Sequence, residues 1–459
     1  MKNSFFISRD LEGPYKFLID SSKLHYENST KSKLPYYRYK SKRISFDCIL
    51  FIILNIFNLN FFFKEKIMLL KYKNYNISRY AISEVYKNYD VYFNPVKFFF
   101  ECVKRFYYCA LTIETVINIK NNKVKAAFID HGMYRNGLMI EYFSQKKIPI
   151  YCLGYPKGIF AIKSSNNKIF KYEEIIELKK SKFLDRKNVN KAKKSINKII
   201  DKTELIPWMK SVKFKKIEVN SINKITHLIY THAFTDAQLV YGYDGFKNVF
   251  EWTDFTIKFL LKEKKNRILI KAHPTFFHKK FPTKNALIDQ KLFNKIYEKY
   301  QNDDRVIIFR YPTKNGDLLK GLNKKTILIS HHGSAILEGL HLGFKCIAST
   351  RTFWSKNLKL TNQWNNIKEY KSNLKKNWSE LYFCNKTDLY DVCYQLFCDK
   401  NSLYGKNYWQ QIICDKTKIE RKFLYENSAK IFHEIKIKKI IFDNIIQKIS
   451  KTIHIKNFK

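Results

Sequence analysis

Between residues 225 and 350, short runs of apolar, mostly β-branched residues alternate with longer stretches in which apolar residues recur every three or four positions. The short runs predict buried strands, and the longer stretches predict amphipathic helices. The predicted strands cover residues 226–230, 267–271, 305–310, 327–329 and 346–348. The predicted helices cover residues 246–261, 285–300, 318–322 and 335–342. Apolar strands that alternate with helices are typical of a doubly wound parallel sheet covered on both faces.

The first half of the chain repeats this pattern on a smaller scale. A strand at 125–129, a helix at 138–145 and a strand at 148–153 predict a second βαβ unit. Elsewhere in this half, the spacing of apolar residues predicts helices and one short strand. The helices cover residues 77–86, 98–119 and 189–202, and the strand covers residues 67–70. Residues 1–45 are polar, aromatic and lysine-rich without clear periodicity, which predicts an irregular arm.

Two segments are candidates for contact with a membrane. Residues 49–63 are apolar but include three asparagines, and they are shorter than the ~20 residues that a spanning helix needs. We expect a buried helix of the first domain there, with a membrane-inserted segment as the alternative. From Ile431 onward, isoleucines recur at helical spacing among lysines. This pattern predicts a basic amphipathic helix that either docks across the domains or lies on an anionic membrane.

Histidines follow three of the strands predicted between residues 225 and 350. They are His232, His273 and the pair His331 and His332. The carboxyl ends of parallel strands meet at one edge of a sheet, where ligands of such folds bind. We therefore expect these histidines to lie along one edge.

The last histidine pair is followed by Gly333 and Ser334, at the predicted start of a helix. Free N–H groups and the positive end of the dipole at a helix start suit a phosphate. Gly333 would let the chain approach an anion closely, and Ser334 could cap the helix or donate to an oxygen. Glu338, one turn further on, could accept hydrogen bonds from sugar hydroxyls. The alternative is an ordinary capped helix with solvated polar residues.

Asp130 and His131 follow the strand at 125–129 in the same way. They are candidates for a general base, which must lie within hydrogen-bond reach of the proton that it removes. The alternative is that Asp130 caps the next helix and His131 is an ordinary loop residue.

Charge and cysteine content limit the classes of protein to which this chain could belong. The 459-residue chain has a formal net charge of +46, but its lysines are spread among asparagines and isoleucines throughout. No nucleic-acid-binding signature is present, so the charge predicts attraction to anionic surfaces rather than a specific nucleic acid.

The nine cysteines form no C-x-x-C pair, and the first residues do not resemble a signal peptide. These features predict a cytoplasmic protein with reduced thiols. The histidines show no H-E-x-x-H or H-x-H spacing, so we expect no metal site.

Three motifs carry a family resemblance. They are K-A-H-P at 271–274, Y-P-T at 311–313, and S-H-H-G-S-A-x-L-E-G-x-x-L-G-x-K-x-I at 330–347. Together they resemble the capsular and surface polysaccharide biosynthesis proteins. More distantly, they are similar to the capsule Kdo transferases and the CDP-glycerol glycerophosphotransferases. The segment at 130–137, with Asp, His, Tyr, Asn and Gly, resembles the D-x-x-Y-x-x-x-G segment of such proteins.

The resemblance implies an α/β protein of GT-B type, with two Rossmann-like domains facing across a cleft and a C-terminal helical tail. Residues 1–215 would form the acceptor-side domain with its N-terminal arm, and residues 216–375 the donor-binding domain. Residues 376–459 would be a helical segment that crosses back to the first domain. The implied activity is transfer of a sugar from a nucleotide-activated donor to a glycan or lipid-linked acceptor, in bacterial capsule or lipopolysaccharide biosynthesis. No cofactor is implied, because the nucleotide sugar is a substrate.

The resemblance also implies roles for single residues. The donor-binding residues would be Lys271, His273, Arg310, Thr313, His331, His332, Gly333, Ser334 and Glu338. Among them, His332, Gly333 and Ser334 would hold the phosphates and Glu338 the ribose. Lys271 and His273 would balance phosphate charge, and backbone groups near Arg310 and Thr313 would meet the base. Asp130 or His131 would be the catalytic base, and the acceptor or cleft residues would be Tyr134, Asn136, His232 and Asp236.

Three other functions are compatible with the sequence. A CDP-polyol phosphotransferase of the same architecture would use the same phosphate site. A basic nucleic-acid-binding protein and an inactive scaffold of polysaccharide export are the remaining alternatives. A peripheral contact with the inner face of the cytoplasmic membrane is compatible with the transferase classes.

Overall fold

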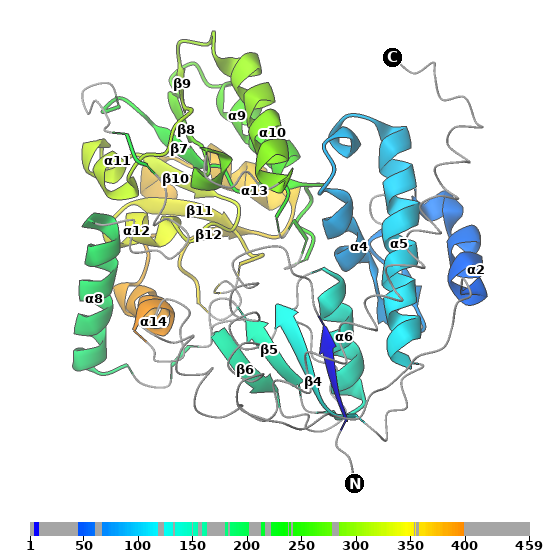
Figure 1. Cartoon of the computed structure of the whole chain (residues 1–459). Coiled ribbons are helices and arrows are strands. Elements are labelled where there is room, and N and C mark those ends of the chain that lie inside the picture. The colour runs from blue at the N-terminus through cyan, green and yellow to red at the C-terminus, as the bar shows by residue number, and fades with distance from the viewer. Residues whose placement is uncertain are drawn as a thin grey trace. The chain divides into compact units, whose positions relative to one another are not determined.

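A computed structural model describes most of the chain between residues 45 and 398, and it forms two compact units. The described residues are 4–8, 45–59, 67–117, 124–131, 134–148, 150–154, 158–162, 180–181, 184–201, 213–215, 222–236, 238–239, 242–277, 284–352, 354 and 358–398. Unit 1 holds the elements from β1 to β6, and unit 2 holds those from α8 to α14 (Figure 1).

Unit 2 is built around a parallel sheet of six strands. They are β7 (His227–Tyr230), β8 (Ile268–Lys271), β9 (Val306–Phe309), β10 (Ile327–Ser330), β11 (Lys345–Ser349) and β12 (Asn362–Trp364). Their order across the sheet is β12-β11-β10-β7-β8-β9, and every neighbouring pair is parallel. The doubly wound parallel sheet predicted from the sequence is therefore confirmed. The strand order reverses between β7 and β10, as in a dinucleotide-binding fold.

Helices cover this sheet. They are α8 (Arg186–Asp201), α9 (Val249–Leu260), α10 (Lys284–Tyr300), α11 (Asn315–Gly321), α12 (Ile336–His341), α13 (Ile367–Lys375) and α14 (Lys386–Phe397), with short 3₁₀ turns η7 (Pro274–Phe277) and η8 (Trp378–Glu380). α12 packs against α8, α11 and α14, and α9 packs against α13 (Figure 1). Between α9 and α13, the buried rings of Trp252, Trp364 and Tyr370 stack together. The predicted helices of this unit are confirmed within a few residues.

Unit 1 has a smaller mixed sheet in the order β1-β4-β5-β6. Its strands are β1 (Ser4–Ser8), β4 (Val124–His131), β5 (Ile150–Gly154) and β6 (Gly158–Ile162). β1 and β5 run parallel to β4, and β6 is antiparallel to β5. The helices are α2 (Phe46–Leu54), α4 (Ser78–Val85), α5 (Pro95–Ile117) and α6 (Arg135–Gln145), with 3₁₀ turns η1 (Ile56–Leu59) and η2 (Asp90–Tyr92). The strands β2 (Lys71–Tyr72) and β3 (Tyr75–Asn76) form a hairpin.

Some local predictions were wrong. The predicted strand at 67–70 is a turn, and the chain pairs only from Lys71, where Lys73 and Asn74 at positive φ close the hairpin. The supposedly irregular arm contains β1, which pairs with β4. The segment that begins at residue 49 is only half buried, and its exposed side is apolar.

Several predictions fall outside the described residues or are not tested by them. The amphipathic tail from Ile431 lies beyond the last described residue. Among the residues that the structure describes, no helix is long and apolar enough to cross a membrane. The domain boundaries and the cleft between two domains remain predictions.

Candidate functional site

The reversal of strand order places the ends of β7 and β10 side by side at the carboxyl edge of the unit 2 sheet. In open α/β sheets, ligands bind at this edge, where chains leave neighbouring strands toward opposite faces. His232 follows β7, and the pair His331 and His332 follows β10. The histidines predicted from the sequence therefore meet at the position where this fold places its ligands.

Three of the histidine rings lie against one another. The ring centroids of His232 and His332 are 3.8 Å apart, and those of His232 and His273 are 5.6 Å apart. Thr231 sets this spacing, because its hydroxyl donates to the carbonyl oxygen of Lys271 and accepts from the backbone N–H of His273, each at 3.0 Å. We call His232, His273 and His332 the histidine cluster.

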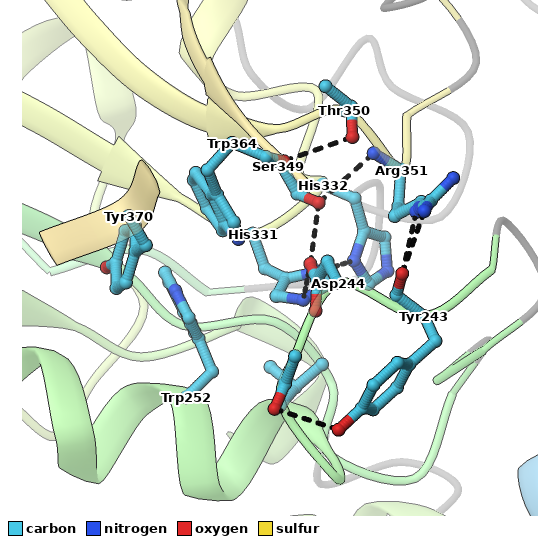
Figure 2. A network of polar contacts seen from close by, with 12 residues as sticks. Tyr243, Asp244, Trp252, His331, His332, Ser349, Thr350, Arg351, Trp364 and Tyr370 are labelled. Carbon is cyan, nitrogen blue, oxygen red and sulfur yellow. Dashed lines mark hydrogen bonds and ion pairs between the residues drawn. The ribbon is translucent and has the colours of Figure 1, made fainter. Parts of the chain in front are cut away.

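Behind the cluster, a chain of hydrogen bonds runs through His331 (Figure 2). Its Nε2 atom lies 2.9 Å from a carboxylate oxygen of Asp244, and its Nδ1 lies 2.7 Å from Nδ1 of His332. A carboxylate only accepts, so His331 donates from Nε2 to Asp244, and one proton is shared between the two Nδ1 atoms of His331 and His332. In His232 the Nδ1–H donates to the Ala233 carbonyl, 3.1 Å away, which leaves the lone pair on Nε2.

Asp244 was not predicted from the sequence. It is almost fully buried, and it accepts a second hydrogen bond from the Ser349 hydroxyl at 2.6 Å. Burial would raise its pKa, but the attraction of His331 and hydrogen bonds from His331 and Ser349 lower it instead. Its loop is tied to the end of β11, since the guanidinium of Arg351 donates to the carbonyl of Tyr243 at 2.8 and 3.1 Å (Figure 2).

The ring of His331 is buried and held by its neighbours. It packs edge-to-face against two buried indoles, with centroid distances of 5.4 Å to Trp252 and 5.9 Å to Trp364 (Figure 2). Together with the bond to Asp244, this packing holds one ring orientation. The Nδ1 contact links this orientation to His332, and the donor contact predicted for His331 stays a prediction.

Two buried ionisable residues follow. Lys271 is close enough to His273 to lower its pKa, and Glu338 interacts with Lys271. Burial lowers the pKa of Lys271 to about 8, against the attraction of Glu338. Burial raises the pKa of Glu338 to about 7, against a hydrogen bond from Asn315 and the attraction of Lys271. Among the described residues, Oε2 of Glu338 has no hydrogen-bond partner. At neutral pH the site thus holds an ammonium and a half-ionised carboxyl group in place of two fixed charges.

Burial also lowers the pKa of each histidine in the cluster. For His273 and His332 the pKa falls well below its usual value, and neighbouring histidines add to the effect. The cluster is therefore a set of neutral imidazoles at neutral pH. A dianion bound against Nε2 of His232 would favour protonation of that nitrogen, so its binding would take up protons.

The turn after β10 is compact. The backbone N–H of Gly333 donates to the Ser330 hydroxyl at 3.0 Å, and a Cβ at Gly333 would lie only 2.9 Å from that oxygen. Ser334 does not cap α12, whose N-cap is Ala335 and receives no side-chain hydrogen bond. Gly343, at a φ of 90°, follows the helix end as the sequence predicted.

Three predicted donor-site or cleft residues lie apart from the cluster. The guanidinium of exposed Arg310 lies over the ring of Tyr297 at 4.1 Å and donates to Asn294 of α10. Thr313 is buried beyond β9, where it forms an isolated parallel bridge with Lys215. Asp236 is exposed in the loop after β7.

In unit 1, Asp130 and His131 end β4, but their side chains lie outside the description. Tyr134 follows with φ 55° and ψ −142°, a backbone conformation that non-glycine residues rarely adopt. Such backbones concentrate at functional sites. Asn136, in the first turn of α6, is buried. Arg135 between them donates from Nε to Glu84 of α4 at 2.6 Å, which fixes the start of the helix.

No group of His, Cys, Asp or Glu side chains in the described part of the chain is arranged to hold a metal ion. No protein-family model matches this chain, and no curated protein gives a significant match.

Distant likenesses exist among solved structures. One is KpsC of Thermosulfurimonas dismutans, a beta Kdo 2,4 transferase, with 13% identity and a TM-score of 0.38 over 60% of this chain and 80% of that chain. Another is UDP-GlcNAc 2-epimerase of Methanocaldococcus jannaschii in complex with UDP-GlcNAc and UDP, with 14% identity and a TM-score of 0.30 over 85% and 98%. A further structure of this epimerase gives 13% identity and a TM-score of 0.23 over 72% and 81%. The first is a Kdo transferase, one of the enzyme types that the sequence motifs resemble.

Proposed function

We propose that this protein is a metal-independent glycosyltransferase of GT-B type, acting in bacterial capsule or lipopolysaccharide biosynthesis. It would move a sugar from a nucleotide-activated donor to a glycan or a lipid-linked acceptor. The same site would also serve a CDP-polyol phosphotransferase, which is the second candidate. A cytoplasmic location with peripheral contact at the inner membrane face belongs to the same proposal, because such acceptors are membrane-linked.

One observation carries the proposal. A parallel sheet with dinucleotide-fold strand order gathers Lys271 and the histidine cluster at the edge where its strand order reverses. That edge is where folds of this kind bind nucleotides. A cation with a pKa of about 8 and imidazoles that protonate when an anion arrives are suited to the diphosphate of a nucleotide sugar.

Each residue of the donor site has a proposed role. Lys271 supplies positive charge to the departing nucleotide, and His232, His273 and His332 donate to its oxygens once protonated. Positive groups aimed at a leaving phosphate stabilise the charge that develops in the transition state. Gly333 lets the chain come close to the phosphate, and Ser334 beside it offers a hydroxyl.

The acceptor side of the proposal rests on unit 1. Asp130 or His131, at the carboxyl end of β4, would remove the proton from the acceptor hydroxyl. The buried Tyr134 and Asn136 would shape the acceptor pocket. This role requires the two units to face each other across a cleft, which is part of the proposal.

The test is a thermal-unfolding screen of the full chain against CMP, CDP, UDP, GDP and ADP at low and moderate salt. A nucleotide in hundredfold excess over its Kd adds about 2.7 kcal/mol of stability. We expect one base to give a shift that survives moderate salt and is lost in His332→Gln. CMP would indicate a Kdo-like or sialic-acid-like donor, and CDP would favour the polyol phosphotransferase.

His341→Gln is the matched control. His341 lies at the far end of α12, where its Nε2 is 2.8 Å from the Asn197 side chain, outside the histidine cluster. This variant should keep the wild-type shift. Equal shifts from all five nucleotides that disappear in moderate salt would mean that the net charge binds phosphate without selection. The nucleic-acid-binding class would then replace the glycosyltransferase.

A further inference from the structure

An apolar stripe runs along the outside of α2 and continues into η1. Its members are large side chains that recur every three or four residues and are exposed to solvent. They are Phe46 (74% exposed), Leu50 (41%), Ile53 (58%), Leu54 (71%) and Phe57 (85%). Residues at this spacing share one face of a helix. Large contiguous apolar surfaces of this kind mark an interaction site.

The opposite side of α2 is part of the core of unit 1. Cys48, Phe51 and Ile52 are buried there, and α2 packs against α5 (Figure 1). The ring of Phe51 meets that of Tyr72 in the hairpin, with centroids 5.1 Å apart. The helix is therefore held in place by one apolar side while a second apolar side faces outward. The folding of unit 1 requires the first side but not the second.

Basic residues border the stripe. The hairpin that contacts α2 carries the exposed residues Lys71 and Lys73. Lys73 forms an ion pair with Glu114 of α5 and lies 3.6 Å from Asp47, the one acidic residue of α2, so Lys71 is the hairpin lysine that neither of these carboxylates neutralises. Leu69, 71% exposed, lies just before the hairpin. In the sequence, the flanks of α2 and η1 are also basic, with Lys40, Lys42, Arg43, Lys64 and Lys66. Apolar side chains bordered by lysines on a chain of net charge +46 complement an anionic lipid surface.

We propose that the stripe from Phe46 to Phe57 docks unit 1 onto an anionic lipid bilayer. The nine residues of α2 extend over about 13 Å, far less than the ~30 Å hydrocarbon core, so the helix lies in the plane of the interface. Phe46, Leu54 and Phe57, the most exposed members of the stripe, enter the acyl boundary, and Lys71 meets lipid phosphates. This surface is separate from the histidine cluster, and the inference does not depend on the glycosyltransferase assignment.

The test is co-sedimentation of the full chain with vesicles of equal parts phosphatidylglycerol and phosphatidylcholine. The double variant Leu54→Gln with Phe57→Gln removes two of the most exposed members of the stripe. We expect its vesicle affinity to be at least about tenfold lower than that of the wild type, because these two side chains no longer leave water on binding. Its melting temperature should stay unchanged, since neither side chain is buried in the protein.

The control is a double variant that changes one exposed leucine and one exposed phenylalanine outside the stripe. Leu287→Gln with Phe383→Gln changes an exposed leucine (47%) and an exposed phenylalanine (49%) of unit 2, and it should bind vesicles like the wild type. Equal binding by the α2 variant, or no binding by the wild type, would refute the proposal. A lower melting temperature of the α2 variant would mean that another segment of this chain covers the stripe. If the wild type is a dimer without vesicles and the variant is a monomer, a second copy of the chain covers the stripe.

Discussion

Replacing Glu338 with glutamine tests the electrostatics of the candidate site. The carboxylate of Glu338 raises the pKa of buried Lys271 against the effect of burial, and the result is a pKa of about 8. Lys271 is then about nine-tenths protonated at pH 7 and about one-tenth protonated at pH 9. If the donor phosphates bind only the protonated form, the affinity for the nucleotide should fall about tenfold, or about 1.4 kcal/mol, between these pH values.

In Glu338→Gln the midpoint of this fall should move below pH 8. For each unit by which the pKa of Lys271 drops, the site loses about 1.4 kcal/mol of preference for the charged form. A one-unit drop would lower the protonated fraction at pH 7.5 from about three-quarters to about one-quarter, and the affinity about threefold. Because the pKa of Glu338 itself is about 7, its carboxylate is largely protonated at pH 6, and wild type and variant should converge there.

The measurement is titration calorimetry from pH 6 to pH 9, using the nucleotide that stabilises the protein in the thermal screen. Glu263→Gln, which removes an exposed carboxylate in the turn after α9, is the control and should follow the wild type. A wild-type affinity that does not change between pH 7 and pH 9 would refute the role given to Lys271. A loss in Glu338→Gln that persists at pH 6 would instead support a direct contact of Glu338 with the ribose.

Further predictions concern the stability of unit 2, measured by urea unfolding. Burial lowers the pKa of His227 to about 4, so the free energy of unfolding is unaffected by this group above its unfolded pKa of about 6.5 and is lower by about 2 kcal/mol at pH 5. His227→Leu should remove this loss of stability in acid, and an unchanged loss would assign it to other groups. Asp244→Asn leaves His331 without its buried carboxylate and should cost about 3–5 kcal/mol, whereas a cost below about 1 kcal/mol would show that the pair contributes little. In Gly339→Ala the new methyl group would overlap the side chain of Leu328 in β10, at a cost of about 1–3 kcal/mol; Leu328→Ala in the same chain should make the Gly339 change nearly neutral, and failure of that rescue would place the strain elsewhere.

The strands of unit 2 could be predicted because each central strand is buried on both faces and is therefore a continuous apolar run. The edge strand β12 (Asn362–Trp364) was missed, because its three residues include two amides and offer no such run. In unit 1, β1 was missed for a related reason. Its five residues stand within a polar, lysine-rich stretch, and only pairing with β4 makes them a strand.

The histidine cluster could be predicted from the sequence, because residues that directly follow parallel strands must share one edge. Asp244 could not, since it stands well beyond β7 in a loop, between glycines at positive φ. Its partners, His331 and Ser349, come from other strands, and only the folded chain brings the three together. The ring orientation of His331 depends likewise on the indoles of Trp252 and Trp364.

Strand β1 has a consequence for how unit 1 is made. Its partner residues in β4 are synthesised more than a hundred residues later. A growing chain therefore exposes the Phe5–Ile7 segment for the whole time that α2, α4 and α5 emerge from the ribosome. Until β1 adds to it, β4 presents an open edge of the kind that invites pairing between chains. Slow translation or an excess of nascent chains should therefore favour aggregation through this edge, and chaperones that hold the first strand would determine the yield of folded protein.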